Sequence, residues 1–186
     1  MISIGITGPI ASGKSTVARM VAGKKYPLFC ADQVVTNLYK KKFFIKNLKQ
    51  IFLLDNKKNI KEQIKVILKK NINNFKKLEN IIHPYVRREM IVFLKKTNKI
   101  VVFEIPLLFE GKLEKYFNVL IYVGANKKVR LKRYLAKKKD PTIFKLLSKR
   151  QLSPSIKQKK SDHTITNNKS LAFLRKNVKN FIKNYE

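Results

Sequence analysis

The sequence predicts an α/β fold in which short buried strands alternate with amphipathic helices. Apolar runs of strand length recur at residues 1–6, 27–30, 100–105 and 118–123, and residues 163–166 predict a last short strand. Between these runs, apolar residues recur at helical spacing, as at residues 127–135 and 171–182. A glycine-containing loop at residues 8–15 separates the first predicted strand from the first predicted helix. Strands that alternate with helices in this way favour a parallel sheet.

Length and composition are those of one compact domain. The chain has 186 residues, of which 44% are hydrophobic, and this suffices for a core with a small helical insertion or lid. No apolar run approaches the roughly 20 residues that span a bilayer, so we expect no membrane association. The first strand starts at the N-terminus, so we expect no signal peptide. The single cysteine, Cys30, excludes an internal disulfide and fits a cytoplasmic location.

The charge is strongly positive, with 43 basic and 11 acidic residues and a formal net charge of +32. A nucleic-acid-binding protein is one interpretation. The other is the codon bias of an AT-rich genome, because all but seven of the basic residues are lysine and Asn, Ile and Phe are plentiful. The lysines are scattered rather than clustered, so we expect no nucleic-acid partner.

Residues 8–15, G-P-I-A-S-G-K-S, match the phosphate-binding pattern G-x-x-x-x-G-K-[ST]. Gly8 and Gly13 allow the backbone conformations that direct several N–H groups at one anion. We expect Lys14 to reach the β- and γ-phosphates of a nucleotide and Ser15 to ligate Mg²⁺. A chance match in a lysine-rich chain is the alternative, and the strand and helix on either side count against it.

Asp32 follows the second predicted strand, where ligands bind in open parallel sheets. One interpretation is a carboxylate within reach of a substrate hydroxyl. The other is the N-cap of a helix that starts at Gln33, and the two are compatible.

Residues 33–97 predict several helices. His83 and Pro84 are expected to open one of them, with Pro84 in its first turn. His83 is either a packing residue at a helix start or a functional residue. Arg87, one turn later, could bind a substrate phosphate through its planar fork or lie on a solvated face.

The strand at residues 100–105 carries one acid, Glu104, in an otherwise apolar run. A buried carboxylate is costly unless it lies beside a cation, so a role at Mg²⁺ is one interpretation. The apolar turn that follows includes Phe109 and fits either a ligand wall or the core. Basic helices at residues 127–135 and 142–151 fit either a lid that closes over phosphates or a solvated surface.

The motifs resemble those of the dephospho-CoA kinase family over essentially the full chain. The matching segments, in order, are residues 6–16 (ITGPIASGKST), Ala31 and Asp32, residues 78–86 (LENIIHPYV), residues 105–110 (IPLLFE), Gln151, Ser161 and Asp162, and Asn167. The resemblance implies a P-loop kinase fold, with a parallel five-stranded sheet flanked by helices. It also implies transfer of the γ-phosphate of ATP to the ribose 3′-hydroxyl of dephospho-CoA, giving coenzyme A and ADP.

The resemblance also implies roles for individual residues. Asp32 matches the general base, and His83, Arg87 and Phe109 match acceptor-binding positions. The residues expected to bind ATP are Gly8, Ala11, Ser12, Gly13, Lys14, Ser15 and Thr16. Ser15 and Glu104 are the expected metal ligands, and Lys14 and Asp32 are the expected catalytic residues.

The expected single domain, residues 1–186, consists of a core at about 1–32, 98–126 and 160–186, a CoA-binding region at about 33–97 and a lid at about 127–159. The chain departs from the usual family pattern at Pro9 and Ala11, where glycines are typical, and at Cys30 and Glu104, where aspartates are typical. The arginine expected early in the lid has no clear match. Another P-loop small-molecule or nucleotide kinase, a basic nucleic-acid-binding module and an inactive homologue are the alternatives. The sequence carries no signal for an oligomeric state.

Overall fold

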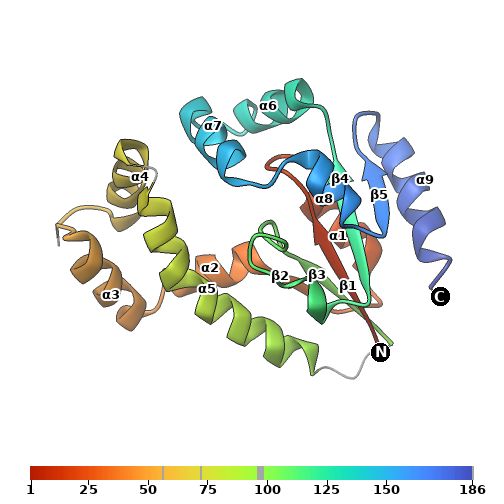
Figure 1. Ribbon diagram of the computed structural model, residues 1–186, viewed down its shortest axis with the longest axis horizontal. Helices are drawn as coiled ribbons and strands as arrows, with labels where there is room; N and C mark the ends of the chain where they lie inside the picture. The colour runs from red at the N-terminus through yellow and green to blue at the C-terminus, as the bar shows by residue number, and fades with distance from the viewer. Residues whose placement is uncertain (56, 72, 96–98, 186) are drawn as a thin grey trace. The chain divides into compact units, whose positions relative to one another are not determined.

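Five strands form one parallel sheet in the computed structural model, which describes residues 1–55, 57–71, 73–95 and 99–185 (Figure 1). The strands are β1 (Ile2–Thr7), β2 (Leu28–Cys30), β3 (Ile100–Glu104), β4 (Val119–Gly124) and β5 (His163–Thr166). They lie in the order β2-β3-β1-β4-β5, and every neighbouring pair is parallel. The predicted α/β fold with a five-stranded parallel sheet is confirmed.

The helices occupy the segments between and after the strands. They are α1 (Lys14–Ala22), α2 (Ala31–Leu38), α3 (Lys42–Phe52), α4 (Ile60–Lys70), α5 (Asn73–Leu94), the short 3₁₀ helix η1 (Glu114–Tyr116), α6 (Lys127–Leu135), α7 (Pro141–Arg150), α8 (Pro154–Lys159) and α9 (Leu171–Ile182). Within the described residues, no helix combines the length and apolar character that crossing a bilayer requires.

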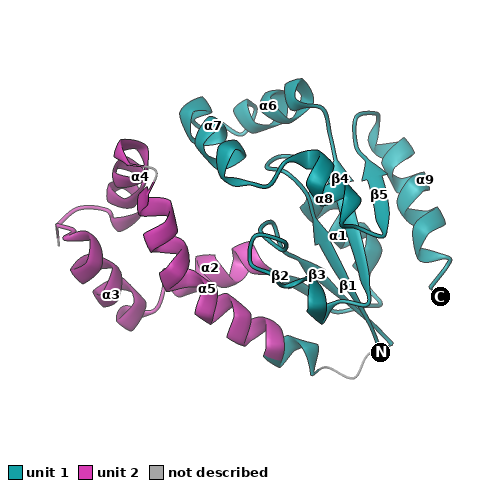
Figure 2. Ribbon diagram, viewed as in Figure 1, with its two compact units in different colours: residues 1–30, 92–186 teal, residues 31–91 magenta. Residues whose placement is uncertain are grey.

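The chain divides into two compact units (Figure 2). Unit 1 holds residues 1–30 and 92–186 and contains the whole sheet, and unit 2 holds residues 31–91 and is helical. In unit 2, Phe44 and Leu48 of α3 are fully buried, and the Phe44 ring contacts the rings of Tyr39 and Tyr85. Each unit therefore has an apolar centre of its own.

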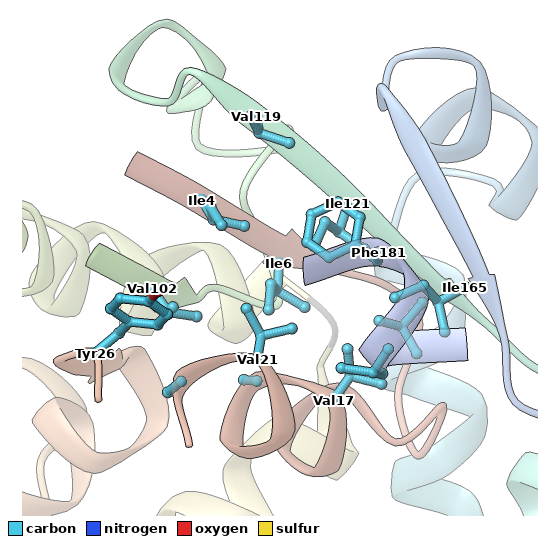
Figure 3. Packing of buried hydrophobic residues seen from close by; sticks show 14 of the residues in the cluster. Ile4, Ile6, Val17, Val21, Tyr26, Val102, Val119, Ile121, Ile165 and Phe181 are labelled. Carbon is cyan, nitrogen blue, oxygen red and sulfur yellow. The ribbon is translucent and has the colours of Figure 1, made fainter. Parts of the chain in front are cut away.

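The main core of unit 1 lies between the sheet and the helices α1 and α9 (Figure 3). Ile4 and Ile6 of β1 and Val17 of α1 are fully buried there, and Phe181 of α9 is 7% exposed. Ile100 and Val102 of β3 face this core, while Val101 and Phe103 face the other side of the sheet and are also fully buried, so both faces are apolar, as a covered parallel sheet requires. This packing fixes the carboxyl ends of β1, β2 and β3 side by side.

Three expectations about elements need correction or completion. Pro84 does not open a helix but lies inside the continuous helix α5. Ile82, Val86 and Met90 are buried on one face of α5, and this packing keeps the helix continuous across a residue that lacks an N–H donor. Helix α8 was not predicted. The expected boundary at residues 97 and 98 and the end of the core at residue 186 lie outside the described residues.

Candidate active site

The loop at residues 8–13 joins β1 to α1 through an unusual backbone. Gly8 has φ 152° and Gly13 has φ 96°, values that residues with a side chain rarely adopt. A Cβ atom on Gly8 would lie 2.2 Å from the Val123 carbonyl oxygen, and one on Gly13 would lie 2.2 Å from Asn167 Nδ2. In the described part of the chain, no side chain caps α1, so its N-terminus is suited to an anion.

Lys14, the first residue of α1, is 7% exposed and folds back over this loop. Its Nζ donates a hydrogen bond to the Pro9 carbonyl oxygen at 3.0 Å. The ammonium group therefore lies against the same loop whose N–H groups are expected to hold phosphates. A bound nucleotide would offer this cation stronger, charged acceptors than one carbonyl oxygen.

Glu104 brings together the ends of three elements. It ends β3, is 3% exposed and pairs in register with Ile6 of β1 and Cys30 of β2. Ser15 Oγ donates to Glu104 Oε1 at 2.5 Å, and Cys30 Sγ donates to Glu104 Oε2 at 3.3 Å. The Ser15 hydroxyl and the Glu104 carboxylate are the hard oxygen donors that Mg²⁺ prefers, so these residues fit the predicted metal. The described residues contain no cluster of three or more His, Cys, Asp or Glu side chains suited to a metal.

Polar side chains distant in sequence fix the tip of the loop. Gln151 Oε1 accepts from Ile10 N at 2.9 Å, and the Arg130 guanidinium donates to the Ile10 carbonyl oxygen at 3.3 Å. Asn167 Nδ2 donates to the Ser12 carbonyl oxygen at 2.8 Å. Burial lowers the pKa of Arg130, and the nearby Tyr122 opposes that change. The loop is thus held by side chains that contact the Ile10 N–H and the carbonyl oxygens of Ile10 and Ser12.

These supporting residues were missed as site residues. The sequence motifs included Gln151 and Asn167, but no role was predicted for either or for Arg130. Arg133 extends the same network, because it donates to both the carbonyl and the side-chain oxygen of Asn167. A signal was available for the arginines, since only seven occur in so lysine-rich a chain.

Phe109 lies in unit 1, in the turn after β3, and is 4% exposed. The Lys160 ammonium lies 5.8 Å from the centre of its ring. Such an arrangement is a cation–π contact, which combines a packed ring face with a nearby positive charge.

Asp32, His83 and Arg87 all lie in unit 2. Helix α2 begins at Ala31, two residues before the predicted start, so Asp32 lies exposed in its first turn, where a carboxylate stabilises the helix N-terminus. His83 is partly buried on α5, and Arg87 follows four residues later and is exposed. That spacing places His83 and Arg87 on one face of α5. The structure therefore brings together Lys14, Ser15 and Glu104 in unit 1, and His83 and Arg87 in unit 2.

The backbone of the loop is strained at Ala11, and a substitution can test this strain. Its φ is 59°, a left-handed conformation that costs a residue with a Cβ about 1–2 kcal/mol. Ala11→Gly should therefore raise the free energy of unfolding by about 1 kcal/mol, or the Tm by roughly 2–4 °C. Thermal unfolding of the purified variant measures this. As a matched control, Ala172→Gly at an exposed position of α9 should lower the Tm, and a fall with Ala11→Gly as well would contradict the strain.

Comparisons of this chain with a family model and with curated proteins agree on one family. A family model described as "Dephospho-CoA kinase" matches residues 2–172. The dephospho-CoA kinase of Fusobacterium nucleatum is 35% identical over 188 residues, covering 96% of this chain and 95% of that protein. The dephospho-CoA kinase of Rickettsia prowazekii is 32% identical over 189 residues, covering 100% of this chain and 98% of that protein.

Solved structures agree in fold. The protein TT1252 from Thermus thermophilus has a TM-score of 0.80 and 28% identity, covering 100% of this chain and 98% of its own. The dephospho-CoA kinase from Campylobacter jejuni has a TM-score of 0.66 and 28% identity, covering 97% of this chain and 95% of its own. A shikimate kinase from Acinetobacter baumannii, 14% identical with a TM-score of 0.57, has the same fold.

Proposed function

Because the chain belongs to the dephospho-CoA kinase family, we propose that it phosphorylates the ribose 3′-hydroxyl of dephospho-CoA with ATP, giving coenzyme A and ADP. The observation that carries this proposal is the glycine-containing loop of a chain that matches the family over residues 2–172, with Lys14 folded over the loop and Ser15 bonded to the buried Glu104. Another P-loop kinase activity is not favoured, since the family match covers residues 2–172.

Binding of the donor follows from unit 1. The residues proposed to bind ATP are Gly8, Ala11, Ser12, Gly13, Lys14, Ser15 and Thr16. We expect the Lys14 ammonium to leave the Pro9 carbonyl oxygen and pair with the β- and γ-phosphates. Ser15 and Glu104 would hold Mg²⁺, which neutralises charge on the phosphates when it is bound.

Binding of the acceptor is proposed for unit 2 and the turn after β3. His83 and Arg87 share a face of α5, and the Arg87 fork suits a phosphate group of the acceptor. Phe109 would pack against the acceptor. We assign residues 31–91 to acceptor binding and residues 127–159 to a lid over the donor phosphates, with the sheet and remaining helices as the core.

Asp32 is the proposed general base. The exposed carboxylate would accept the proton of the 3′-hydroxyl while the oxygen of that hydroxyl bonds to the γ-phosphorus. The bond between that phosphorus and the β–γ bridging oxygen breaks, and ADP leaves with the bond electrons. Most of the rate gain then comes from positioning and from the Lys14 charge.

The proposed partners are the small molecules ATP and dephospho-CoA, in the cytoplasm. We attribute the lysine excess to the codon bias of an AT-rich genome, and we propose no nucleic-acid partner. The single cysteine supports a reducing compartment.

The test is turnover of ATP by the purified protein, with and without dephospho-CoA, with coenzyme A detected by mass. We expect ADP and coenzyme A in equal amounts, and loss of both products when EDTA removes Mg²⁺. Activity retained in EDTA would contradict the metal role of Ser15 and Glu104. Turnover with a nucleoside monophosphate but none with dephospho-CoA would contradict the proposed acceptor.

A further inference from the structure

Lys157 of α8 is unlike most lysines of this chain because its side chain is fully buried. Its Nζ lies 2.8 Å from Glu110 Oε1 and donates to the Pro106 carbonyl oxygen at 3.0 Å. Lys14 is the other lysine among the buried charged residues of the described chain. Most lysines of this chain are exposed, as the cost of burying a charge predicts. A buried lysine that contacts both a carboxylate and a carbonyl oxygen therefore stands out as a candidate for a specific role.

Contacts of this ion pair reach the phosphate-binding loop at its start. The Pro106 carbonyl oxygen that accepts from Lys157 also accepts from Thr7 Oγ1 at 3.2 Å. Thr7 is the last residue of β1 and directly precedes Gly8. One carbonyl oxygen thus joins α8, the turn after β3 and the entry to the loop.

A second set of contacts reaches the tip of the loop. Glu110 Oε1, the oxygen paired with Lys157, accepts from Leu152 N at 2.8 Å. The preceding residue, Gln151, accepts from Ile10 N at the tip. The Glu110 carboxylate therefore fixes the backbone position from which Gln151 holds the loop.

Stability alone does not explain such a pair. Removing two charges from water costs several kcal/mol per ion, and an apolar pair of similar volume is often as stable. Burial lowers the pKa of Lys157, while its hydrogen bond and charge interaction with Glu110 act in the opposite direction. What an apolar pair could not supply is the directed bonds to the Pro106 carbonyl oxygen and the Leu152 N–H.

We propose that Lys157 and Glu110 are positioning residues that hold the start and the tip of the phosphate-binding loop in its nucleotide-binding geometry. The pair acts through Pro106 and Thr7 at the start of the loop and through Leu152 and Gln151 at its tip. This inference rests on the proposed role of the loop in binding ATP, and it assigns no contact between the pair and the nucleotide.

The test compares nucleotide affinity with thermal stability in three variants. Lys157→Met and Glu110→Gln each leave one partner buried without its counter-charge, so we expect the Tm of each to fall by about 6–20 °C. The Kd for a fluorescent ATP analogue should rise about 10- to 100-fold, since the loop loses its fixed geometry. Lys157→Met/Glu110→Leu removes both charges and should regain most of the Tm but not the affinity.

Matched controls are available nearby. Lys115→Met changes an exposed lysine of η1, outside the proposed lid, and Glu114→Gln changes a carboxylate that lies 3.9 Å from Lys160 in a partly exposed pair. Both should leave the Kd unchanged. Recovery of the Kd together with the Tm in the double variant would overturn the proposal, because the pair would then serve stability alone.

The kinetic readout separates this proposal from the proposed function. In the variants, KM for ATP should rise more than KM for dephospho-CoA. A wild-type protein that forms no coenzyme A would refute the proposed reaction, yet the comparison of Kd values would still decide the role of the pair. A single variant too unstable to purify leaves the decision to the double variant.

Discussion

Asp32→Asn should reduce coenzyme A formation by about 100- to 10,000-fold, the usual contribution of a positioned general base. Asparagine has the same shape as aspartate but cannot accept the proton of the attacking hydroxyl. ATP binding should be unchanged, because the proposed site for the phosphates is the loop at residues 8–15. Single-turnover rates and the Kd for an ATP analogue separate the two effects.

A matched control for Asp32→Asn lies in the same unit. Asp55 is exposed and pairs with Lys58 at 3.7 Å, so Asp55→Asn removes an equal charge at a position that is not among the proposed site residues. It should leave turnover within a factor of about two, as expected of surface substitutions. Equal rates for Asp32→Asn and the wild type would remove Asp32 from the mechanism.

Lys14→Met should lower kcat/KM for ATP by about 100- to 1,000-fold, comparable with the loss of one preorganised group that stabilises transition-state charge. The substitution keeps the aliphatic stem and removes the ammonium group that now bonds to the Pro9 carbonyl oxygen. The Tm should fall by roughly 3–12 °C, since a bond from an ammonium group to a carbonyl oxygen is worth about 1.5–3 kcal/mol. Steady-state kinetics with ATP varied at saturating dephospho-CoA measure the effect.

Two further variants sharpen this result. Lys24→Met, at an exposed position just after α1, tests whether the overall positive field of the chain contributes, and it should have no measurable effect. Lys14→Arg retains the charge but replaces a point cation with a planar fork, so it should remain impaired. Full activity in Lys14→Arg would show that charge alone, without geometry, accounts for the role of Lys14.

The local parts of the fold were predictable from sequence. Strands β3 and β5 and helices α6 and α9 lie within a residue of the expected bounds, because each is specified by its own apolar periodicity. The bond between Ser15 and Glu104 joins two residues singled out by local signals, a loop motif and an acid in an apolar strand. Both signals are complete within a few residues, so they need no knowledge of tertiary contacts.

The residues that hold the loop were not predictable in the same way. Asn167 contacts Ser12 across 155 positions, and Arg130 contacts Ile10 across 120. No local pattern marks such partners. The burial of Lys157 could not be predicted either, because nothing in the sequence distinguishes it from the many exposed lysines of the chain. Pro84 was misjudged because proline is a strong local signal that tertiary packing along α5 overrides.

Positions of the phosphate-binding loop differ in whether they can accommodate a side chain. Ala11 occupies a left-handed conformation and is partly exposed, so a methyl group is accommodated there at the cost of some strain. At Gly13 a methyl carbon would lie 2.2 Å from the Asn167 amide nitrogen, so no side chain fits there without a shift of that amide. The Asn167 side chain therefore does two things: its amide fixes the loop through the Ser12 carbonyl oxygen, and its position excludes a side chain at residue 13.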